Sequence, residues 1–393
     1  MFENKSAVIQ DLDIHKGLVM LKEIEIQNFR CFEQIKISGF ERVNLIGGKN
    51  NAGKTALLEA IFLYKDPDGR SIFALKTLRR ESLESIEPIE PIESIEPIEL
   101  IQSRFKRGWE NFFYSQNKDA AIVIHGKDES NVIHKIEMCL DESGNVNNIF
   151  DDQNVERLRE SFLKDKDDLL VLNIKSNRDN QESVQSVVIA TSSRQYWFGK
   201  RPNVNEPPFI PSCMRSSGTD LMELFDLARL DDKYREVLKA FQVLDSSIES
   251  VESFLIGEPT LYLRRKGEKR LPLSLFGDAI NRVAEIILKL VNNKHKILLI
   301  DEIENGIHYT SQREFWRFLF RLAVELDTQI FATTHSLEML QAFADVGLEP
   351  NQKCSSAYFE LARKLKTNQI IGIRRDLETL SYAIEHQEGV RGE

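Results

Sequence analysis

Cysteine is scarce in this chain of 393 residues, and long apolar runs are missing. The four cysteines (Cys31, Cys139, Cys213 and Cys354) lie far apart without paired spacing, so the sequence indicates neither a disulfide framework nor a zinc site. No stretch approaches the roughly 20 apolar residues that a membrane-spanning helix needs. The N-terminus also lacks the basic stretch and apolar stretch of a secretion signal. We therefore expect a cytoplasmic protein that has no membrane contact.

Positive charge is also in deficit, because the formal net charge is −10. This argues against a protein that coats DNA, since non-specific DNA affinity comes mainly from neutralised phosphates. Two local basic clusters remain candidates for DNA contact. One, on a predicted hairpin, consists of Arg264, Arg265, Lys266, Lys269 and Arg270, and the other, just before the acidic repeat, consists of Lys76, Arg79 and Arg80. A solvated face or a contact with a partner protein is the other interpretation of both clusters.

Residues 48–55 match the pattern G-x-x-x-x-G-K-[ST], in which backbone N–H groups surround phosphates. An apolar run at 43–46 predicts a buried strand before the loop, and apolar residues at helical spacing follow it. The N-terminus of that helix favours an anion. Lysine then serves the β- and γ-phosphates, and the hydroxyl serves Mg²⁺. The predicted nucleotide-binding residues are Gly48, Asn51, Ala52, Gly53, Lys54 and Thr55.

A second motif lies at residues 297–302, where four apolar residues precede Asp301 and Glu302. The apolar run predicts a buried parallel strand, which delivers both acids to the carboxyl edge of the sheet. An aspartate there can associate with Mg²⁺, and a glutamate can orient and deprotonate the attacking water. Two solvated acids that open a turn are the alternative, which the phosphate loop upstream disfavours. Together the two motifs predict an ATPase that uses ATP and Mg²⁺.

Two weaker pieces follow the same order along the chain. His335 comes after a second strand-like run, at a place where it could contact the γ-phosphate. Ser274 and the backbone near Gly277 precede an amphipathic helix and could donate to phosphate oxygens at its N-terminus. By itself each piece is more often structural. Their order after the phosphate loop gives them their functional interpretation.

This order resembles the ABC-type ATPase superfamily in its soluble RecF/SMC branch, and within it the ATPases related to the OLD (overcoming lysogenization defect) nucleases. Residues 21–32 resemble that branch's opening hairpin, residues 271–278 its signature segment, and residues 301–308 its extended acid motif. The resemblance implies an α/β fold: an ABC-type P-loop ATPase head with a mixed β-sheet flanked by helices, and an inserted, mainly helical lobe.

The resemblance also implies a composite site, in which ATP held by one protomer is capped by Ser274 and Gly277 of another. Glu302 would be the catalytic base and His335 a second catalytic residue, the switch histidine. Asp301 and Thr55 would be the magnesium-associated residues. Asn305 and His308 would lie near the dimer contact. The glutamine that usually links Mg²⁺ to the inserted lobe is not placed, although Gln195 has about the right order in the chain.

The predicted organisation has five parts along the chain. They are a flexible N-terminal tail (1–19), the first part of the head (20–80), an acidic Ile/Pro/Glu repeat loop (81–100), a sheet continuation with a helical insertion (101–259) and the second part of the head (260–393). Strands are expected at 120–124 and 132–137, helices from 218 to 254, a hairpin at 358–373 and a short helix at 376–386. No heptad run is long enough for a coiled-coil arm.

An OLD nuclease would continue into a Toprim nuclease domain, and only 58 residues follow His335, so we expect any nuclease to be a separate chain. The leading hypothesis is an ATPase that dimerises on ATP and regulates a separately encoded effector, by resemblance in bacterial anti-phage defence. The alternatives are a RecF-like repair or recombination ATPase that binds DNA directly, and a non-hydrolysing scaffold. Intact Lys54, Asp301 and Glu302 disfavour the scaffold. The opening hairpin and the extended acid motif argue against a transporter subunit.

Overall fold

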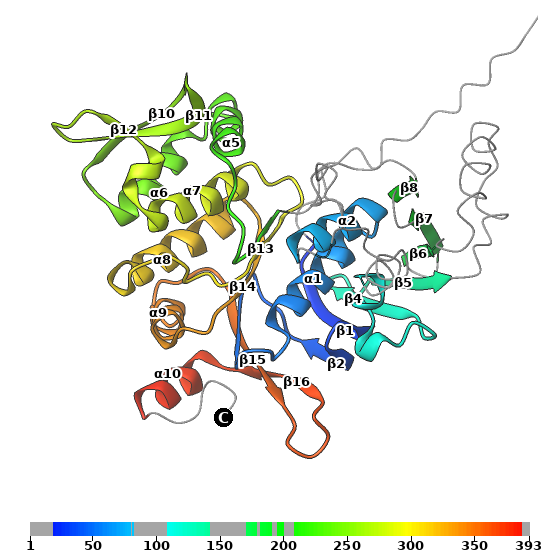
Figure 1. The fold of residues 1–393 in the computed structure, drawn as a ribbon. Helices are drawn as coiled ribbons and strands as arrows, with labels where there is room; N and C mark the ends of the chain where they lie inside the picture. The colour runs from blue at the N-terminus through cyan, green and yellow to red at the C-terminus, as the bar shows by residue number, and fades with distance from the viewer. Residues whose placement is uncertain are drawn as a thin grey trace, which may run out of the picture.

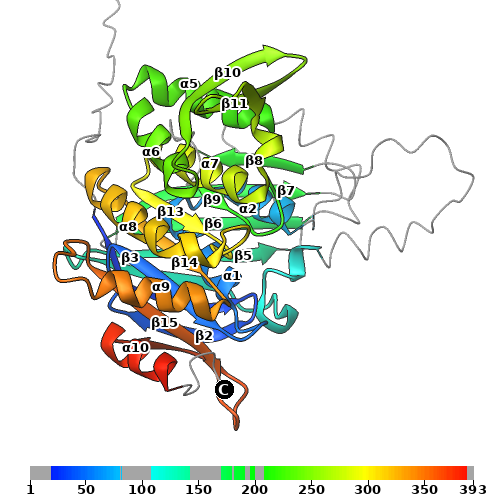
Figure 2. The same cartoon turned by 90° about the vertical axis from the view of Figure 1, so that its left-hand side faces the viewer.

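The computed structural model describes residues 19–79, 81, 108–141, 170–178, 181–190, 195–199 and 208–386, with only the backbone of most of 181–199. The acidic repeat after Glu81, the predicted tail up to residue 18 and the side chain of Gln195 therefore lie outside the described residues. Within these ranges the chain forms three β-sheets with helices between and around them (Figures 1 and 2). Every described helix falls short of the length and apolar character that crossing a bilayer requires.

One sheet is antiparallel and has seven strands. Its order is β2 (Phe32–Ser38), β1 (Leu21–Phe29), β4 (Ile122–Asp128), β5 (Ile133–Asp141), β6 (Leu170–Arg178), β7 (Gln181–Ala190) and β8 (Gln195–Gly199). In β1, buried Ile24 and Ile26 alternate with partly exposed glutamates, the pattern of a strand with one face in the core. The predicted opening hairpin and the strands near 120–137 are confirmed.

A six-stranded sheet carries the sequence motifs. Its order is β16 (Ile370–Arg375), β15 (Ser356–Arg363), β3 (Val43–Gly48), β14 (Gln329–Thr333), β13 (Ile297–Ile300) and β9 (Phe209–Ile210). All pairs are parallel except β15 with β16. Every residue of β3, β13 and β14 is buried, which is why these strands read as apolar runs without alternation. The predicted buried strands and the C-terminal hairpin are confirmed.

Helix α1 (Lys54–Lys65) lies between the two large sheets and contacts both of them (Figure 2). It packs into one core together with Ile297 and Leu299 of β13. Leu298 and Ile300 of the same strand point into a second core. That core is made by α7 (Asp278–Val291), α8 (Tyr309–Glu325) and α9 (Leu337–Gly347). The six-stranded sheet is therefore covered on both faces, and successive residues of β13 stabilise different layers.

Two shorter helices and a 3₁₀ turn accompany the two large sheets. Helix α2 (Gly69–Leu78) follows α1, a 3₁₀ turn covers Tyr114–Gln116, and α10 (Leu377–Glu385) packs on α9. The predicted C-terminal helix is thus confirmed.

A smaller lobe lies beyond α7 and contains α5 (Gly218–Leu230), α6 (Tyr234–Leu244) and a three-stranded sheet (Figure 1). The strands are β10 (Ile248–Ile256), β11 (Glu258–Arg265) and β12 (Arg270–Pro272). The expected helix up to residue 254 is wrong from Ile248 onward. Apolar residues there recur at a spacing of three, which mimics a helix, but the segment pairs with β11. Pairing with a later strand overrode the local pattern.

His134 of β5 leads to a prediction about stability and pH. Its Nε2 lies 2.6 Å from the Ser176 Oγ, and its ring centroid lies 5.0 Å from that of Tyr64. Burial lowers the pKa of His134 from 6.5 to about 4, and Arg178 adds to this effect. Between these pH values the unfolded chain binds the proton and the folded chain does not. The stability is therefore complete above pH 6.5 and falls as the pH drops towards 4.

The expected slope from this residue is at most about 1.4 kcal/mol per pH unit. Chemical denaturation of wild type and His134→Gln between pH 7 and pH 4.5 measures it, with the variant losing less stability over that range. His295, whose pKa burial also lowers to about 4, is unchanged in both proteins, so the difference isolates His134. Parallel stability curves for the two proteins would contradict the prediction.

Candidate active site

The phosphate-loop pattern lies between β3 and α1, as predicted. Gly48, Asn51 and Gly53 have positive φ angles of 136°, 62° and 91°. A Cβ atom on Gly48 would lie 2.3 Å from the Leu361 carbonyl oxygen, and one on Gly53 would lie 2.8 Å from the Cys31 Sγ. Both pattern glycines are thus required by backbone conformation and by close packing.

Lys54 is the first residue of α1, and its side chain folds back over the loop. Its Nζ donates to the carbonyl oxygens of Gly48 (2.7 Å) and Lys49 (3.0 Å). Burial lowers the pKa of Lys54, while Asp301, Glu304 and Glu302 act in the opposite direction. The loop therefore holds a positive charge at the position where the sequence predicts the phosphates.

Asp301 lies at the end of β13, next to the start of α1. Its carboxylate accepts hydrogen bonds from the Thr55 Oγ1 at 3.1 and 3.0 Å, and from the Thr333 Oγ1 at 2.7 Å. Thr55 and Asp301 supply the oxygen atoms that Mg²⁺ prefers. No group of three His, Cys, Asp or Glu side chains suited to a metal occurs among the described residues. The pair fits a Mg²⁺ ion that takes most of its ligands from phosphates and water.

Glu302 has a left-handed backbone with a φ angle of 50°, which is uncommon outside glycine and asparagine. Its N–H donates to the Thr333 Oγ1 at 2.8 Å, and its carboxylate accepts from the Asn305 Nδ2 at 3.0 Å. Thr333 thus fixes the side chain of Asp301 and the backbone of Glu302. Sequence reasoning missed this residue, although a threonine that ends a fully buried strand must find a hydrogen-bond partner.

His335 lies beside the two acids, but its ring contacts a third one. Its Nδ1 is 2.9 Å from the Glu304 Oε1 and 3.9 Å from the Glu302 Oε1. The His335 N–H also donates to the Glu304 Oε1 at 2.8 Å, while the buried Oε2 has no hydrogen-bond partner among the described residues. Glu304 was not predicted as a site residue. Its place two residues after Glu302, in a motif that leaves the strand, was the available signal.

A cavity of about 420 Å³ adjoins the phosphate loop. Its walls are Arg30, Cys31, residues 50–56, Arg79, Asn111, Asp301 and Glu302. Arg30 was not predicted. It donates to Glu59 and Glu81 and stacks on the Phe112 ring, 4.2 Å from the ring centroid. A positive φ angle in the opening hairpin places it there.

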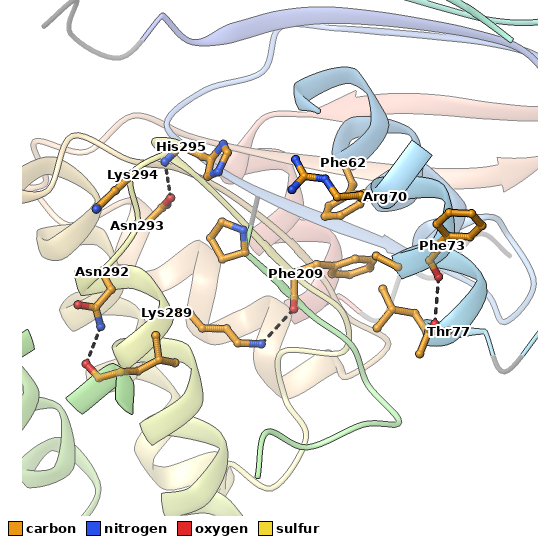
Figure 3. Close-up of a pocket in the computed structure, with 14 residues that line it drawn as sticks. Phe62, Arg70, Phe73, Thr77, Phe209, Lys289, Asn292, Asn293, Lys294 and His295 are labelled. Atoms are coloured by element: carbon orange, nitrogen blue, oxygen red, sulfur yellow. Dashed lines mark hydrogen bonds between the residues drawn. The ribbon is translucent and has the colours of Figure 1, made fainter. Parts of the chain in front are cut away.

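Ser274 and Gly277 do not line this cavity. They lie in and after a 3₁₀ turn (Leu273–Phe276) at the N-terminus of α7, where both are exposed. The structure therefore brings the loop, the two acids and His335 together in one chain and leaves the signature segment apart. A larger cavity of about 690 Å³ lies between α1, α2 and the end of α7, and contains none of the predicted residues (Figure 3).

The basic cluster lies on the hairpin of β11 and β12, as predicted, and most of its charge is paired. Arg264, Arg265 and Arg270 form ion pairs with Glu249, Asp245 and Glu252. Arg265 also lies 3.9 Å from Glu268. Five cations (+5) and these four acids (−4) leave a formal charge of +1. Lys266 and Lys269 are exposed and form no ion pair with a described residue.

The fold and the site define an ABC-type P-loop ATPase head. A family model described as "AAA domain, putative AbiEii toxin, Type IV TA system" matches residues 144–340, half of the chain. Another, described as "AAA ATPase domain", matches residues 20–198. Because the first family model matches half of the chain, the chain belongs to the AAA domain family that this model describes. The chain hydrolyses ATP, with Mg²⁺ as the accompanying cation.

Three similar proteins show how far the likeness extends. An ATP/GTP phosphatase of Helicobacter pylori is 24% identical over 392 residues, covering 95% of this chain and 100% of that protein. The DNA double-strand break repair Rad50 ATPase of Archaeoglobus fulgidus is 40% identical over 68 residues, which cover 17% of this chain and 7% of that protein. The solved SMC head bound to the C-winged helix domain of ScpA covers 91% of this chain and 98% of its own, at 9% identity and a TM-score of 0.46.

The double contact of Thr333 yields a prediction about magnesium. Thr333→Val keeps the shape and removes the hydroxyl that Asp301 and Glu302 share. Outer-shell substitutions of this kind cost on the order of 10- to 100-fold in metal affinity or activity. We expect ATP turnover to fall by that range and to need more Mg²⁺ for half-maximal rate.

Thr328→Val is the matched control, because Thr328 is equally buried just before the same strand and its hydroxyl donates to the Leu326 carbonyl oxygen, away from the two acids. Steady-state hydrolysis over a Mg²⁺ titration compares both variants with wild type. Equal effects of the two substitutions would show that Thr333 has only a packing role.

Proposed function

We propose that ATP joins two copies of this chain head to head, and that the closed dimer regulates a separately encoded effector such as a nuclease. One observation carries the proposal: the cavity at the phosphate loop lacks the signature segment of its own chain, which is exposed elsewhere. Leu275 is 68% exposed in this segment, and a Cβ atom on Gly277 would meet nothing within 4 Å. The segment is open to a second copy.

The roles proposed for the single-chain part of the site follow from its contacts. The loop and Lys54 bind the phosphates, and Thr55 and Asp301 hold Mg²⁺, which neutralises charge on the transferred phosphoryl group when bound. Glu302 orients and deprotonates the attacking water. His335 contacts Glu304 when no nucleotide is bound. When ATP binds, His335 contacts the γ-phosphate instead. Ser274 and Gly277 of the second copy complete the site.

Anti-phage defence is the setting that we propose. The description of the matching family contains the words "putative AbiEii toxin, Type IV TA system", and we take a toxin system as a model for an ATPase with a separate partner. The resemblance to ATPases of the OLD branch supports the same setting. An ATPase that changes its assembly with ATP is suited to control such a partner, because binding energy at the nucleotide shifts the population of the closed state.

A RecF-like repair ATPase that binds DNA directly is the second candidate. The segment shared with the Rad50 ATPase favours it. The basic cluster on β11 and β12 gives it little support, because its formal charge falls to +1 once the neighbouring acids are counted. A non-hydrolysing scaffold is disfavoured by the intact pairing of Asp301 with Thr55.

Glu302→Gln separates ATP binding from ATP hydrolysis. The amide cannot accept a proton, so turnover should fall by on the order of 10²- to 10⁴-fold while binding continues. Light scattering should then show that the variant accumulates as an ATP-dependent dimer or larger assembly. Lys54→Ala, which removes a phosphate contact, should keep the same mass with and without ATP. An identical mass for Glu302→Gln in every nucleotide state would contradict the composite site.

DNA stimulation decides between the two candidate functions. In the effector proposal, double-stranded DNA leaves ATP turnover unchanged at low salt, where electrostatic binding is strongest. A Lys266→Gln, Lys269→Gln double variant tests the two exposed lysines of the cluster, with Lys353→Gln as the control for charge alone. If DNA stimulates wild type and not the double variant, the repair function replaces our proposal.

A further inference from the structure

Arg282 is a fully buried arginine on α7, and no sequence motif includes it. Its side chain is 0% exposed. The Nη2 atom donates to the Asp301 carbonyl oxygen at 2.7 Å, and the Nη1 atom donates to the Pro211 carbonyl oxygen at 2.8 Å. Glu285 on the same helix lies 3.7 Å from Nη1. The guanidinium thus links α7 to the end of β13 and to the segment after β9.

A buried arginine is energetically unfavourable if its role is only to fill space. Removing a charge from water costs several kcal/mol, and an apolar residue of similar volume often packs equally well. Burial lowers the pKa of Arg282, Glu285 acts in the opposite direction, and the Nε atom has no hydrogen-bond partner among the described residues. Packing alone therefore does not account for the residue, and its directed hydrogen bonds do.

Arg282 donates to the peptide group that joins Asp301 to Glu302. The carbonyl of Asp301 and the N–H of Glu302 belong to the same planar unit. Arg282 holds the carbonyl oxygen, and the Thr333 hydroxyl accepts from the N–H at 2.8 Å. The peptide is clamped at both ends, immediately before the left-handed φ angle of Glu302. Its plane sets the direction in which both carboxylates leave the strand.

Helix α7 touches the acid motif at a second point. A Cβ atom on Gly306 would lie 3.1 Å from the Ala279 backbone nitrogen, so the loop after the acids packs closely against the first turn of α7. The signature segment with Ser274 and Gly277 precedes that turn. The signature segment, which is exposed to a second copy, therefore lies at the start of α7. Arg282, which holds the Asp301–Glu302 peptide of its own chain, lies one turn later on the same helix.

We propose that Arg282 is a positioning residue that fixes the peptide between Asp301 and Glu302 and makes it move with the signature segment. This inference rests on the proposed function, because the signature is taken to cap the nucleotide of a second copy. Docking of α7 on that nucleotide then aligns the acids of its own chain. Arg282 acts through the backbone of the acids and touches no substrate.

Lys289 provides a matched control on the same helix. Its Nζ lies 3.1 Å from the Glu285 Oε1 and donates to the Phe209 carbonyl oxygen at 3.3 Å. Both cations therefore pair with Glu285 and anchor α7 to the segment around β9 (Lys289 is drawn in Figure 3). Only Arg282 reaches Asp301. Arg282→Met and Lys289→Met each replace a long cationic side chain with a long apolar one.

The experiment measures kcat and KM for ATP, the melting temperature without nucleotide, and the ATP-dependent mass of each variant in the Glu302→Gln background. We expect Arg282→Met to lower kcat by on the order of 10- to 100-fold, as loss of an outer-shell contact does, with little change in KM. It should also raise the ATP concentration needed for the dimer. Lys289→Met should match wild type in kcat and dimer formation. Arg282→Lys should recover part of both.

Equal losses of melting temperature with kcat unchanged in both variants would overturn the proposal and leave Arg282 a structural residue. If Arg282→Met does not fold, Arg282→Lys is compared with Lys289→Met instead, by kcat and by melting temperature. If Glu302→Gln never forms a dimer, the proposed function fails. The difference in kcat between the Arg282 and Lys289 variants would then still show whether the peptide clamp exists.

Discussion

The carboxylate of Asp301 is the point on which the site depends. It accepts hydrogen bonds from Thr55, at the start of α1, and from Thr333, at the end of β14. These contacts require that β3, β14 and β13 lie side by side in parallel, with Ile46 opposite Thr333 and Ile300 opposite Ala332. Parallel strands end at one edge of a sheet, and ligands bind outside that edge. A phosphate loop, a hydroxyl and an acid therefore meet there.

The layers on the two faces of the six-stranded sheet belong to separate cores. Helix α1 is packed between two sheets, so the loop at its N-terminus is attached to the core that these sheets share. The opposite face of the six-stranded sheet is covered by α7, α8 and α9, which belong to a separate core. The signature segment is attached to this second layer. In our proposal, a displacement of α7 reaches the acids through the hydrogen bond from Arg282 to the Asp301 carbonyl oxygen.

Three energetically unfavourable features occur at the site. Glu302 has a left-handed backbone, Arg282 is a buried cation, and one oxygen of Glu304 is buried without a described partner. Each costs free energy, of order 1–3 kcal/mol for a strained backbone residue. The described core also buries charged side chains away from the two acids, such as Lys76 and Glu360. Strain of this kind persists where the surrounding contacts over-determine the geometry, as the clamp on the Asp301–Glu302 peptide does.

The sequence by itself determined the local elements that carry chemistry. The phosphate loop, the strands before it and before Asp301, and the helix at α1 follow from residue types at fixed short spacings, which depend on backbone geometry alone. The tertiary structure decided which side chains complete them. Thr333, Glu304, Arg30 and Arg282 each have a hydrogen-bond partner at least 19 residues away along the chain. Ile248 onward became a strand because β11 lay beside it. Such choices depend on packing between segments distant in the chain, and no local pattern contains that information.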